Sequence, residues 1–308
     1  MYNGFFGLTS APFSIAPNPE FMYLSPRHAE ALAHLRFGLG EAGGFVLLTG
    51  EVGTGKTTVS RCLLQELDER AEVAFILNPT LSELELLAAI CDELKIRYKK
   101  TDASLKLLGD KIKARLLKNH AAGKHTLLII DEAQHLQPAV LEQLRLLTNL
   151  ETNTHKLLQV ILIGQPELQQ LLKRNDLRQL AQRITARYHL LPLTLEEVRQ
   201  YLKFRLQVAG CSRPVFNDGA IKRLFQLSGG IPRLVNLMAD RALLGAYSQQ
   251  QALVTDKLVS QAAAEILPLS EQAVNTALPR WFWPVIGLCA IVLGFSLALI
   301  ILPLLQLR

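Results

Sequence analysis

The chain has 308 residues, of which 49% are hydrophobic and 19% charged, with a net charge of +6. This length allows one large or two medium domains, and the charge excess contains no block of like charges that would indicate a nucleic-acid partner. The four cysteines are widely spaced without a C-x-x-C pair, which argues against a disulfide scaffold or a zinc site. The first 16 residues lack the basic start and long apolar run of a signal peptide.

The first 42 residues form a lead-in to the rest of the chain. Residues 1–20 combine phenylalanines with prolines, which predicts an irregular segment packed against the domain that follows. Ser25 and Pro26 predict the cap and the first turn of a helix over residues 27–39.

A phosphate-loop pattern, G-x-x-x-x-G-K-[ST], occupies residues 50–57. The preceding apolar residues predict a buried strand over 45–48, and a helix is expected over 57–67 with its N-terminus facing an anion. Glycines permit the positive φ angles that let successive N–H groups surround a phosphate. We expect ATP to be bound by the whole loop: Gly50, Glu51, Val52, Gly53, Thr54, Gly55, Lys56, Thr57 and Thr58. Lys56 would contact the β- and γ-phosphates and Thr57 would ligate Mg²⁺.

Strands and helices then alternate. Further strands are expected over residues 73–77, 127–130, 158–163 and 188–191, and helices over 80–94, 103–119 and 138–150. A capping box is expected at Thr80 and Glu83. This alternation predicts a three-layer α/β domain with a parallel sheet over residues 43–192.

An acidic pair, Asp131 and Glu132, follows the buried stretch 127–130. A carboxylate at that point lies at the carboxyl edge of a parallel sheet, where open α/β folds bind ligands. We expect Asp131 to hold Mg²⁺ and Glu132 to polarise the attacking water, so that ATP is hydrolysed. The alternative is that Asp131 only caps the following turn.

Helices alone are expected after residue 192. A second capping box at Thr194 and Glu197 opens a helix ending near Ala209, and helices follow over residues 218–227, 232–247 and 256–266. They predict a small all-helical lid domain over residues 193–267, joined by a linker, 268–280, to the C-terminal segment.

The C-terminal segment, residues 281–305, contains no charged residue, and its apolar run 285–302 rises about 27 Å as a helix. Arg280 and two tryptophans precede this run, as is typical of a membrane interface. These features predict a single transmembrane helix with the preceding domains in the cytoplasm, where ATP is available. The alternatives are a buried core helix and an amphipathic hairpin.

The chain resembles the AAA+ ATPases, a P-loop NTPase family, and within them the type II secretion component A (ExeA/GspA) family. The resemblance rests on residues 5–8, 11–13, 50–58 and 130–134, and above all on Leu-Ile-Gly-Gln-Pro-Glu-Leu at 162–168 and Gly-Gly-Ile-Pro-Arg at 229–233. In this family a periplasmic peptidoglycan-binding domain follows the membrane helix. We find no such domain after residue 305, which favours the shorter members that serve MSHA-type pilus biogenesis.

The resemblance implies further site residues. Gln165 would take the position that senses the γ-phosphate, although it could instead cap the helix that starts at Pro166. Arg233 would be the sensor arginine of the lid. Arg183 and Arg187 would be candidate arginine fingers for a neighbouring subunit's nucleotide, unless they are solvated surface charges.

The resemblance and the motifs together predict a bacterial inner-membrane ATPase. It would act as a ring or dimer with pilus or type II secretion assembly proteins. One alternative is a DNA-associated ATP switch like the regulators of transposition, which the membrane segment argues against. The other is a structural protein with negligible turnover in which ATP controls only ring formation.

Overall fold

The computed structural model describes residues 2–16, 18–39, 44–77, 79–150 and 156–266. Residues Met1–Ala262 form one compact unit, and most of a second unit, Ala263–Arg308, lies outside the described residues. The predicted linker 268–280 and membrane helix 281–305 fall there, so both stay predictions. In the described part, no helix is long and apolar enough to cross a membrane.

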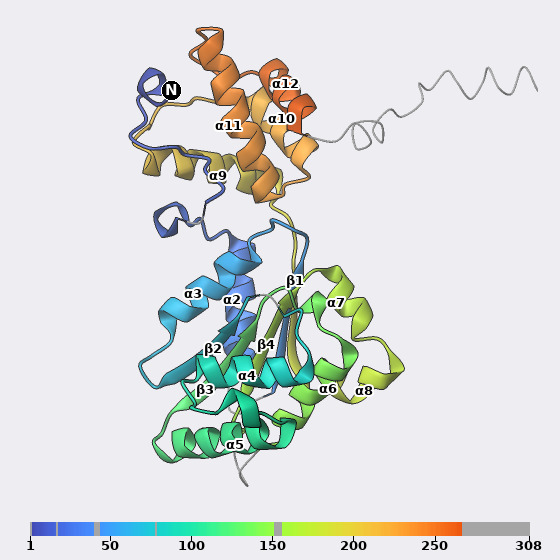
Figure 1. The fold of residues 1–308 in the computed structure, drawn as a ribbon. Coiled ribbons are helices and arrows are strands. Elements are labelled where there is room, and N and C mark those ends of the chain that lie inside the picture. The colour runs from blue at the N-terminus through green and yellow to red at the C-terminus, as the bar shows by residue number, and fades with distance from the viewer. Residues whose placement is uncertain (1, 17, 40–43, 78, 151–155, 267–308) are drawn as a thin grey trace, which may run out of the picture. The chain divides into compact units, whose positions relative to one another are not determined.

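A parallel sheet of five strands organises the first unit (Figure 1). Its order is β2-β3-β4-β1-β5, and every neighbouring pair is parallel. The strands are β1 Phe45–Gly50, β2 Ala71–Ile76, β3 His125–Ile130, β4 Gln159–Gly164 and β5 Ile184–Leu190. Every residue of β1 is buried, as expected for a central strand covered on both faces.

Helices cover both faces of the sheet, which confirms the predicted three-layer α/β architecture. Because side chains alternate along a strand, Val46 and Leu48 pack on one side of β1 while Phe45 and Leu47 pack on the other. The first face is covered by α2 Pro26–Gly38 and α3 Lys56–Glu66. The second is covered by α4 Glu83–Glu93, α5 Leu105–Ala121 and α6 Pro138–Leu147.

The edge strand β5 is longer than the predicted 188–191. Its residues alternate between buried and exposed positions, so it lacks the continuous apolar run that identifies the central strands. Three short helical pieces connect β4 to β5, and their brevity removes the usual periodic signal. They are α7 Pro166–Leu171, η4 Asn175–Leu177 and α8 Arg178–Ala181.

Helix caps were predicted from the sequence at three positions, and the structure shows which residues form them. Ser25 accepts a hydrogen bond from the backbone of α2, and Thr194 forms a capping box with Glu197, as predicted. The capping box expected at Thr80 and Glu83 is wrong by two residues, because Ser82 and Glu85 form it instead. Both pairs satisfy the same sequence pattern, and only the observed helix start distinguishes them.

After the sheet come α9 Leu195–Val208, α10 Asp218–Ser228, α11 Pro232–Ser248 and α12 Asp256–Ile266, here called the helical region. These bounds agree with the predicted helices to within a few residues. The compact unit Met1–Ala262 contains both the sheet and nearly all of this region. The predicted domain boundaries at residues 42, 192 and 267 therefore stay predictions.

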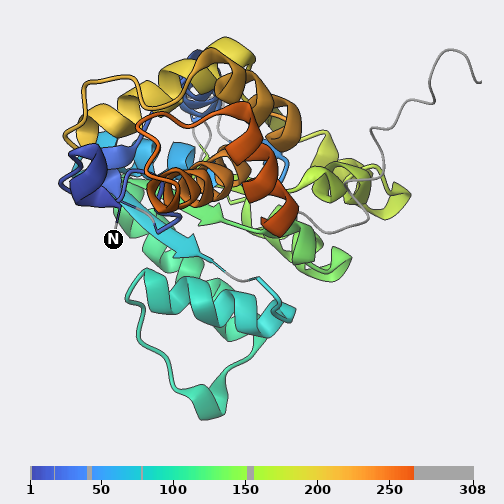
Figure 2. The ribbon, with the colours of Figure 1, turned by 90° about the horizontal axis from the view of Figure 1, so that it is seen from above.

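The N-terminal segment, residues 2–23, contains α1 Asn3–Phe6 and the short helix η1 Pro19–Phe21. We expected residues 1–20 to pack against the domain that follows, but the first part of the segment packs on the helical region (Figure 2). Phe5 lies edge-on to Tyr247, Phe13 lies edge-on to Phe216, and Thr9 donates to the Ala209 carbonyl at 2.8 Å. Tertiary contacts between aromatic rings, which local sequence cannot reveal, decided this placement.

We expect Phe13→Ala to lower the free energy of unfolding by about 3 kcal/mol, because Phe13 is 1% exposed and its removal leaves a cavity. The matched control is Phe37→Ala, since the Phe37 side chain is 79% exposed. Urea denaturation of both variants measures the difference. Equal stabilities would contradict the proposed packing of the segment.

Candidate functional site

Two glycines allow the backbone of the loop between β1 and α3 to turn tightly. Gly53 and Gly55 have φ angles of 82° and 104°, in the region that side chains rarely adopt. Thr54 closes the loop with a hydrogen bond from its hydroxyl to the Glu51 carbonyl at 2.9 Å. The loop then runs directly into the N-terminus of α3 at Lys56, which is the arrangement that binds phosphate.

Lys56 is buried within this loop. Its ammonium donates to the carbonyls of Gly50 and Glu51 at 2.8 and 3.0 Å. Burial lowers the pKa of Lys56, and the nearby carboxylates of Glu132 and Asp131 oppose that change. The loop therefore holds a positive charge in a place with little water, where it attracts an anion strongly.

Thr57 and Asp131 meet across the loop. The Thr57 hydroxyl donates to Oδ2 of Asp131 at 3.1 Å, and Asp131 is 4% exposed. Burial raises the pKa of Asp131, and hydrogen bonds from the Glu132 backbone and from Thr57 oppose that increase. A hydroxyl and one carboxylate oxygen are the protein ligands that suit Mg²⁺ beside a phosphate, so these two residues fit that ion.

Glu132 lies beside this pair in a left-handed conformation, with φ of 54°. Its backbone N–H donates to Oδ1 of Asp131 at 2.9 Å, which stabilises that conformation. Burial would raise the pKa of Glu132, but hydrogen bonds from Gln134 and Gln165 and the charge of Lys56 outweigh it and lower the pKa. Glu132 is therefore a carboxylate at neutral pH.

Gln165 contacts Glu132, with its side-chain nitrogen 3.2 Å from Oε2. Gln165 does occupy the N-cap position of α7, as the alternative expected, but its side chain makes no capping hydrogen bond. Gln134 connects the two residues: it donates to Glu132 at 2.6 Å and accepts from the Gln165 backbone at 3.1 Å. The sequence analysis assigned Gln134 no role, although it lies only two residues after Glu132.

Arg233, at the start of α11 in the helical region, contacts the phosphate loop. Its backbone N–H donates to the Gly53 carbonyl at 3.3 Å, and a Cβ on Gly53 would lie 2.6 Å from the Arg233 Cβ. The turn before α11 needs Gly230, whose φ is 77° and whose Cβ would overlap the Leu193 carbonyl. The sequence-predicted Arg233 thus borders the same site as the phosphate loop.

His28, on α2, forms a hydrogen bond with the phosphate loop. The sequence analysis did not identify this residue. Its Nε2 lies 3.0 Å from the Thr54 carbonyl and its Nδ1 lies 2.8 Å from the Ser25 hydroxyl, so a neutral ring donates to Thr54 and accepts from Ser25. A Cβ on Gly55 would lie 2.5 Å from Nε2. Burial lowers the pKa of His28, which favours this neutral form.

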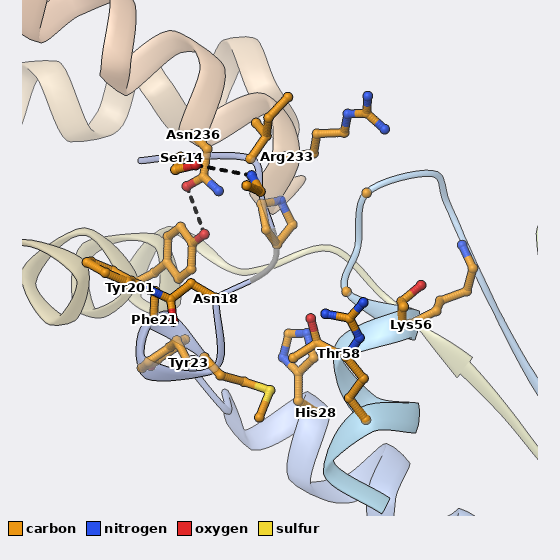
Figure 3. Close-up of a pocket in the computed structure, with 18 of the residues that line it drawn as sticks. Ser14, Asn18, Phe21, Tyr23, His28, Lys56, Thr58, Tyr201, Arg233 and Asn236 are labelled. Atoms are coloured by element: carbon orange, nitrogen blue, oxygen red, sulfur yellow. Dashed lines mark hydrogen bonds between the residues drawn. The ribbon is translucent and has the colours of Figure 1, made fainter. Parts of the chain in front are cut away.

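A cavity of about 420 Å³ is lined by Lys56, Thr57, Glu132, His28 and Arg233, among others (Figure 3). The phosphate loop, including Val52 and Thr58, lines one end. The other end is lined by the N-terminal segment and by Tyr201, Arg205 and Asn236 of the helical region. The volume lies within the usual range of small-molecule sites. Sequence reasoning missed the residues of this second end, because they are scattered along the chain without a motif.

Arg183 and Arg187 do not border this cavity. Arg183 lies beside Phe45, at the opposite end of β1 from the loop, which is roughly 17 Å away at about 3.3 Å per residue. It donates to Asn149 and to the Arg145 carbonyl, and Arg187 is exposed and donates to the Ala181 carbonyl. Neither arginine therefore lines the cavity beside the phosphate loop of its own chain.

Sequence comparisons match residues 40–172 to the AAA domain family. General secretion pathway protein A of Aeromonas hydrophila is 61% identical over 272 residues, which cover 88% of this chain and 50% of that protein. The chain therefore spans about half the length of this relative.

Solved structures with a similar fold include Cdc6p of Pyrobaculum aerophilum, with 17% identity and a TM-score of 0.66 over 83% of this chain and 70% of that one. The ORC1 protein of Aeropyrum pernix in complex with DNA has 20% identity and a TM-score of 0.63, covering 84% and 72%. The RuvB branch migration motor of Thermotoga maritima has 19% identity and a TM-score of 0.53, covering 83% and 76%. At these identities the similarity concerns the fold.

His28 predicts a pH dependence of stability. Because the folded protein lowers the pKa of His28 below its usual value of about 6.5, the unfolded chain binds the proton more readily. The free energy of unfolding should therefore fall as the pH decreases below about 6.5, by at most about 1.4 kcal/mol per pH unit. In His28→Gln this part of the slope should disappear. Urea titrations between pH 5 and 8 measure it, and parallel pH profiles for both proteins would refute the assignment.

Proposed function

We propose that the chain is an AAA ATPase like general secretion pathway protein A, and that it binds ATP and hydrolyses it to ADP and phosphate; the match of residues 40–172 to the AAA domain family and the 61% identity to that protein support this. The observation that carries this proposal is that Lys56, Thr57 and Glu132 line one end of a single cavity, where Thr57 is hydrogen-bonded to Asp131. Each contributes the charge or the oxygen that phosphoryl transfer needs at that position.

In this proposal the phosphate loop binds the β- and γ-phosphates. The backbone N–H groups at the start of α3 and the ammonium of Lys56 neutralise the anionic oxygens. Thr57 and Asp131 would hold Mg²⁺, which when bound supplies further positive charge to those oxygens. Arg233 and Gln165 would respond to the γ-phosphate, since one borders the loop and the other contacts Glu132.

Glu132 would act as the base. It orients a water molecule toward the γ-phosphorus and accepts a proton as the new P–O bond forms. The bond between the γ-phosphorus and the bridging oxygen breaks, and ADP leaves with the electron pair. The ionised state of Glu132 supports this role, because a carboxylate can accept a hydrogen bond from water.

Arg183 and Arg187 are proposed to act on the nucleotide of a neighbouring subunit. Their distance from the cavity of their own chain is consistent with an action in trans. Arg183 ends at the surface near α6, where a second copy in a ring or dimer could approach it. An arginine supplied in trans can accelerate hydrolysis by several orders of magnitude.

The biological setting proposed here is the inner membrane. The 61% identity to a general secretion pathway protein supports a role in assembling a type II secretion machine or a related MSHA-type pilus. The uncharged residues 281–305 support a membrane anchor, with residues 1–280 in the cytoplasm. The partners would then be inner-membrane assembly proteins of that machine.

Glu132→Gln should bind ATP with unchanged affinity but hydrolyse it at least tenfold more slowly, because the amide cannot accept the proton. Phosphate release and fluorescent-nucleotide titration measure the two effects. Glu69→Gln, at an exposed position after α3, is the matched control with wild-type turnover. Full turnover by Glu132→Gln would remove Glu132 from this role.

The ATPase rate per subunit should rise with protein concentration if an arginine acts in trans. Arg183→Ala should abolish that rise while retaining ATP binding, and Arg187→Ala tests the second candidate in the same way. The full chain in detergent or nanodiscs is the sample, and mass photometry reports its oligomeric state. A rate independent of concentration while the protein assembles would rule out a trans arginine.

A further inference from the structure

The end of the cavity distant from the phosphate loop contains a hydrogen-bonded series of three polar side chains, Arg205, Tyr201 and Asn236. Figure 3 labels Tyr201 and Asn236. They are buried, with exposed fractions of 7%, 5% and 7%. Buried polar groups require hydrogen-bond partners, so the direction of each bond constrains the next one.

Arg205 is the first residue of this hydrogen-bonded series, and its guanidinium can only donate hydrogen bonds. It donates to the Pro12 carbonyl, to the Ser14 carbonyl at 3.1 Å, and to the Tyr201 hydroxyl oxygen at 3.1 Å. The guanidinium also lies 5.0 Å from the Phe21 ring centre, so it secures the N-terminal segment on α9. Since Arg205 uses the Tyr201 oxygen as an acceptor, the hydroxyl hydrogen of Tyr201 must point elsewhere.

That hydrogen points to Asn236, whose Oδ1 lies 2.8 Å from the Tyr201 hydroxyl oxygen. Burial raises the pKa of Tyr201, so the phenol keeps its proton and remains a donor. The amide of Asn236 is thereby oriented, with its oxygen toward Tyr201 and its nitrogen on the other side. Figure 3 marks the hydrogen bond between the Asn236 amide oxygen and the Tyr201 hydroxyl.

The amide nitrogen of Asn236 makes no hydrogen bond to any residue in the described part of the chain. It is also not enclosed by protein, because no buried side-chain nitrogen or oxygen in the described residues lacks a partner. The nitrogen therefore faces the cavity that Asn236 lines. A donor oriented in advance into a confined site favours a ligand with an acceptor at that point.

We propose that Asn236 recognises the nucleotide base, donating from its amide nitrogen to a ring nitrogen of adenine. The inference rests on the proposed ATP binding, which places the phosphates at the loop and the base at the opposite end of the cavity. The aromatic side chains of Phe21 and Tyr23 line this end and suit a planar ring. Adenine N1 is an acceptor, whereas guanine N1 carries a hydrogen, so a donor facing N1 favours ATP over GTP.

Asn236→Asp isolates this hydrogen bond, because the remaining oxygen still accepts from Tyr201 while the donor becomes an acceptor. Competition against a fluorescent ATP analogue, measured on the full chain, gives the affinities for ATP and GTP. We expect ATP to bind at least tenfold more weakly and the preference for ATP over GTP to fall. The added negative charge repels both triphosphates alike, so their ratio reports the base contact.

Asn236→Ala with 1-deaza-ATP, 3-deaza-ATP and 7-deaza-ATP identifies the nitrogen. The substitution should weaken ATP binding, but it should not weaken binding of the analogue that lacks the recognised nitrogen. Tyr201→Phe provides a second variant that leaves Asn236 in place: the freed amide can rotate, and the ATP preference should fall as well. Circular dichroism melting curves verify that each variant is folded.

The outcomes separate the two proposals. If the wild-type chain does not bind ATP, the proposed function itself is wrong. If the wild-type chain binds ATP but the Asn236 and Tyr201 variants keep its affinity and its preference over GTP, only the base-recognition role is overturned. Equal losses for ATP and for all three deaza analogues in Asn236→Ala would overturn it too, because no ring nitrogen would then be coupled to the amide.

Discussion

The hydrogen bond between Thr57 and Asp131 joins the two halves of the phosphate end, and the remaining site is arranged around it. Thr57 stands at the start of α3, after the loop that follows β1, while Asp131 directly follows β3. These strands are not adjacent, because β4 lies between them. Parallel pairing brings all three strand ends to one edge, so residues 74 positions apart in the chain become neighbours.

The same edge also supplies the residues that hold Glu132. Gln165 follows β4, the strand between the other two, and Gln134 connects it to Glu132 through both ends of its amide. Glu132 is consequently held by two side-chain donors in a backbone conformation that side chains rarely adopt. Such an arrangement costs stability, and it is maintained because several hydrogen bonds impose it together.

The end of the cavity distant from the phosphate loop is formed by packing between the N-terminal segment and the helical region. The N-terminal segment packs on the helical region, continues past the cavity and then enters α2 beneath the loop. Arg205 fixes this path from α9, and His28 then contacts the loop itself. A ligand in the cavity would therefore touch the loop, the N-terminal segment and the helical region at once, and its binding would couple their positions.

The sequence alone determined the sheet, its two helical layers and the phosphate end, since buried strands, glycine spacing and acidic residues leave local patterns. Gly55, Lys56, Thr57, Asp131 and Glu132 could be predicted as neighbours at one edge of the sheet for this reason, and the structure brings Thr57 and Asp131 within hydrogen-bond distance. Only the tertiary structure decided where the N-terminal segment packs, which pair caps α4, and that Tyr201, Arg205 and Asn236 meet in one cavity. These features depend on contacts between distant residues, whose hydrogen-bond directions become defined only when the chain has folded.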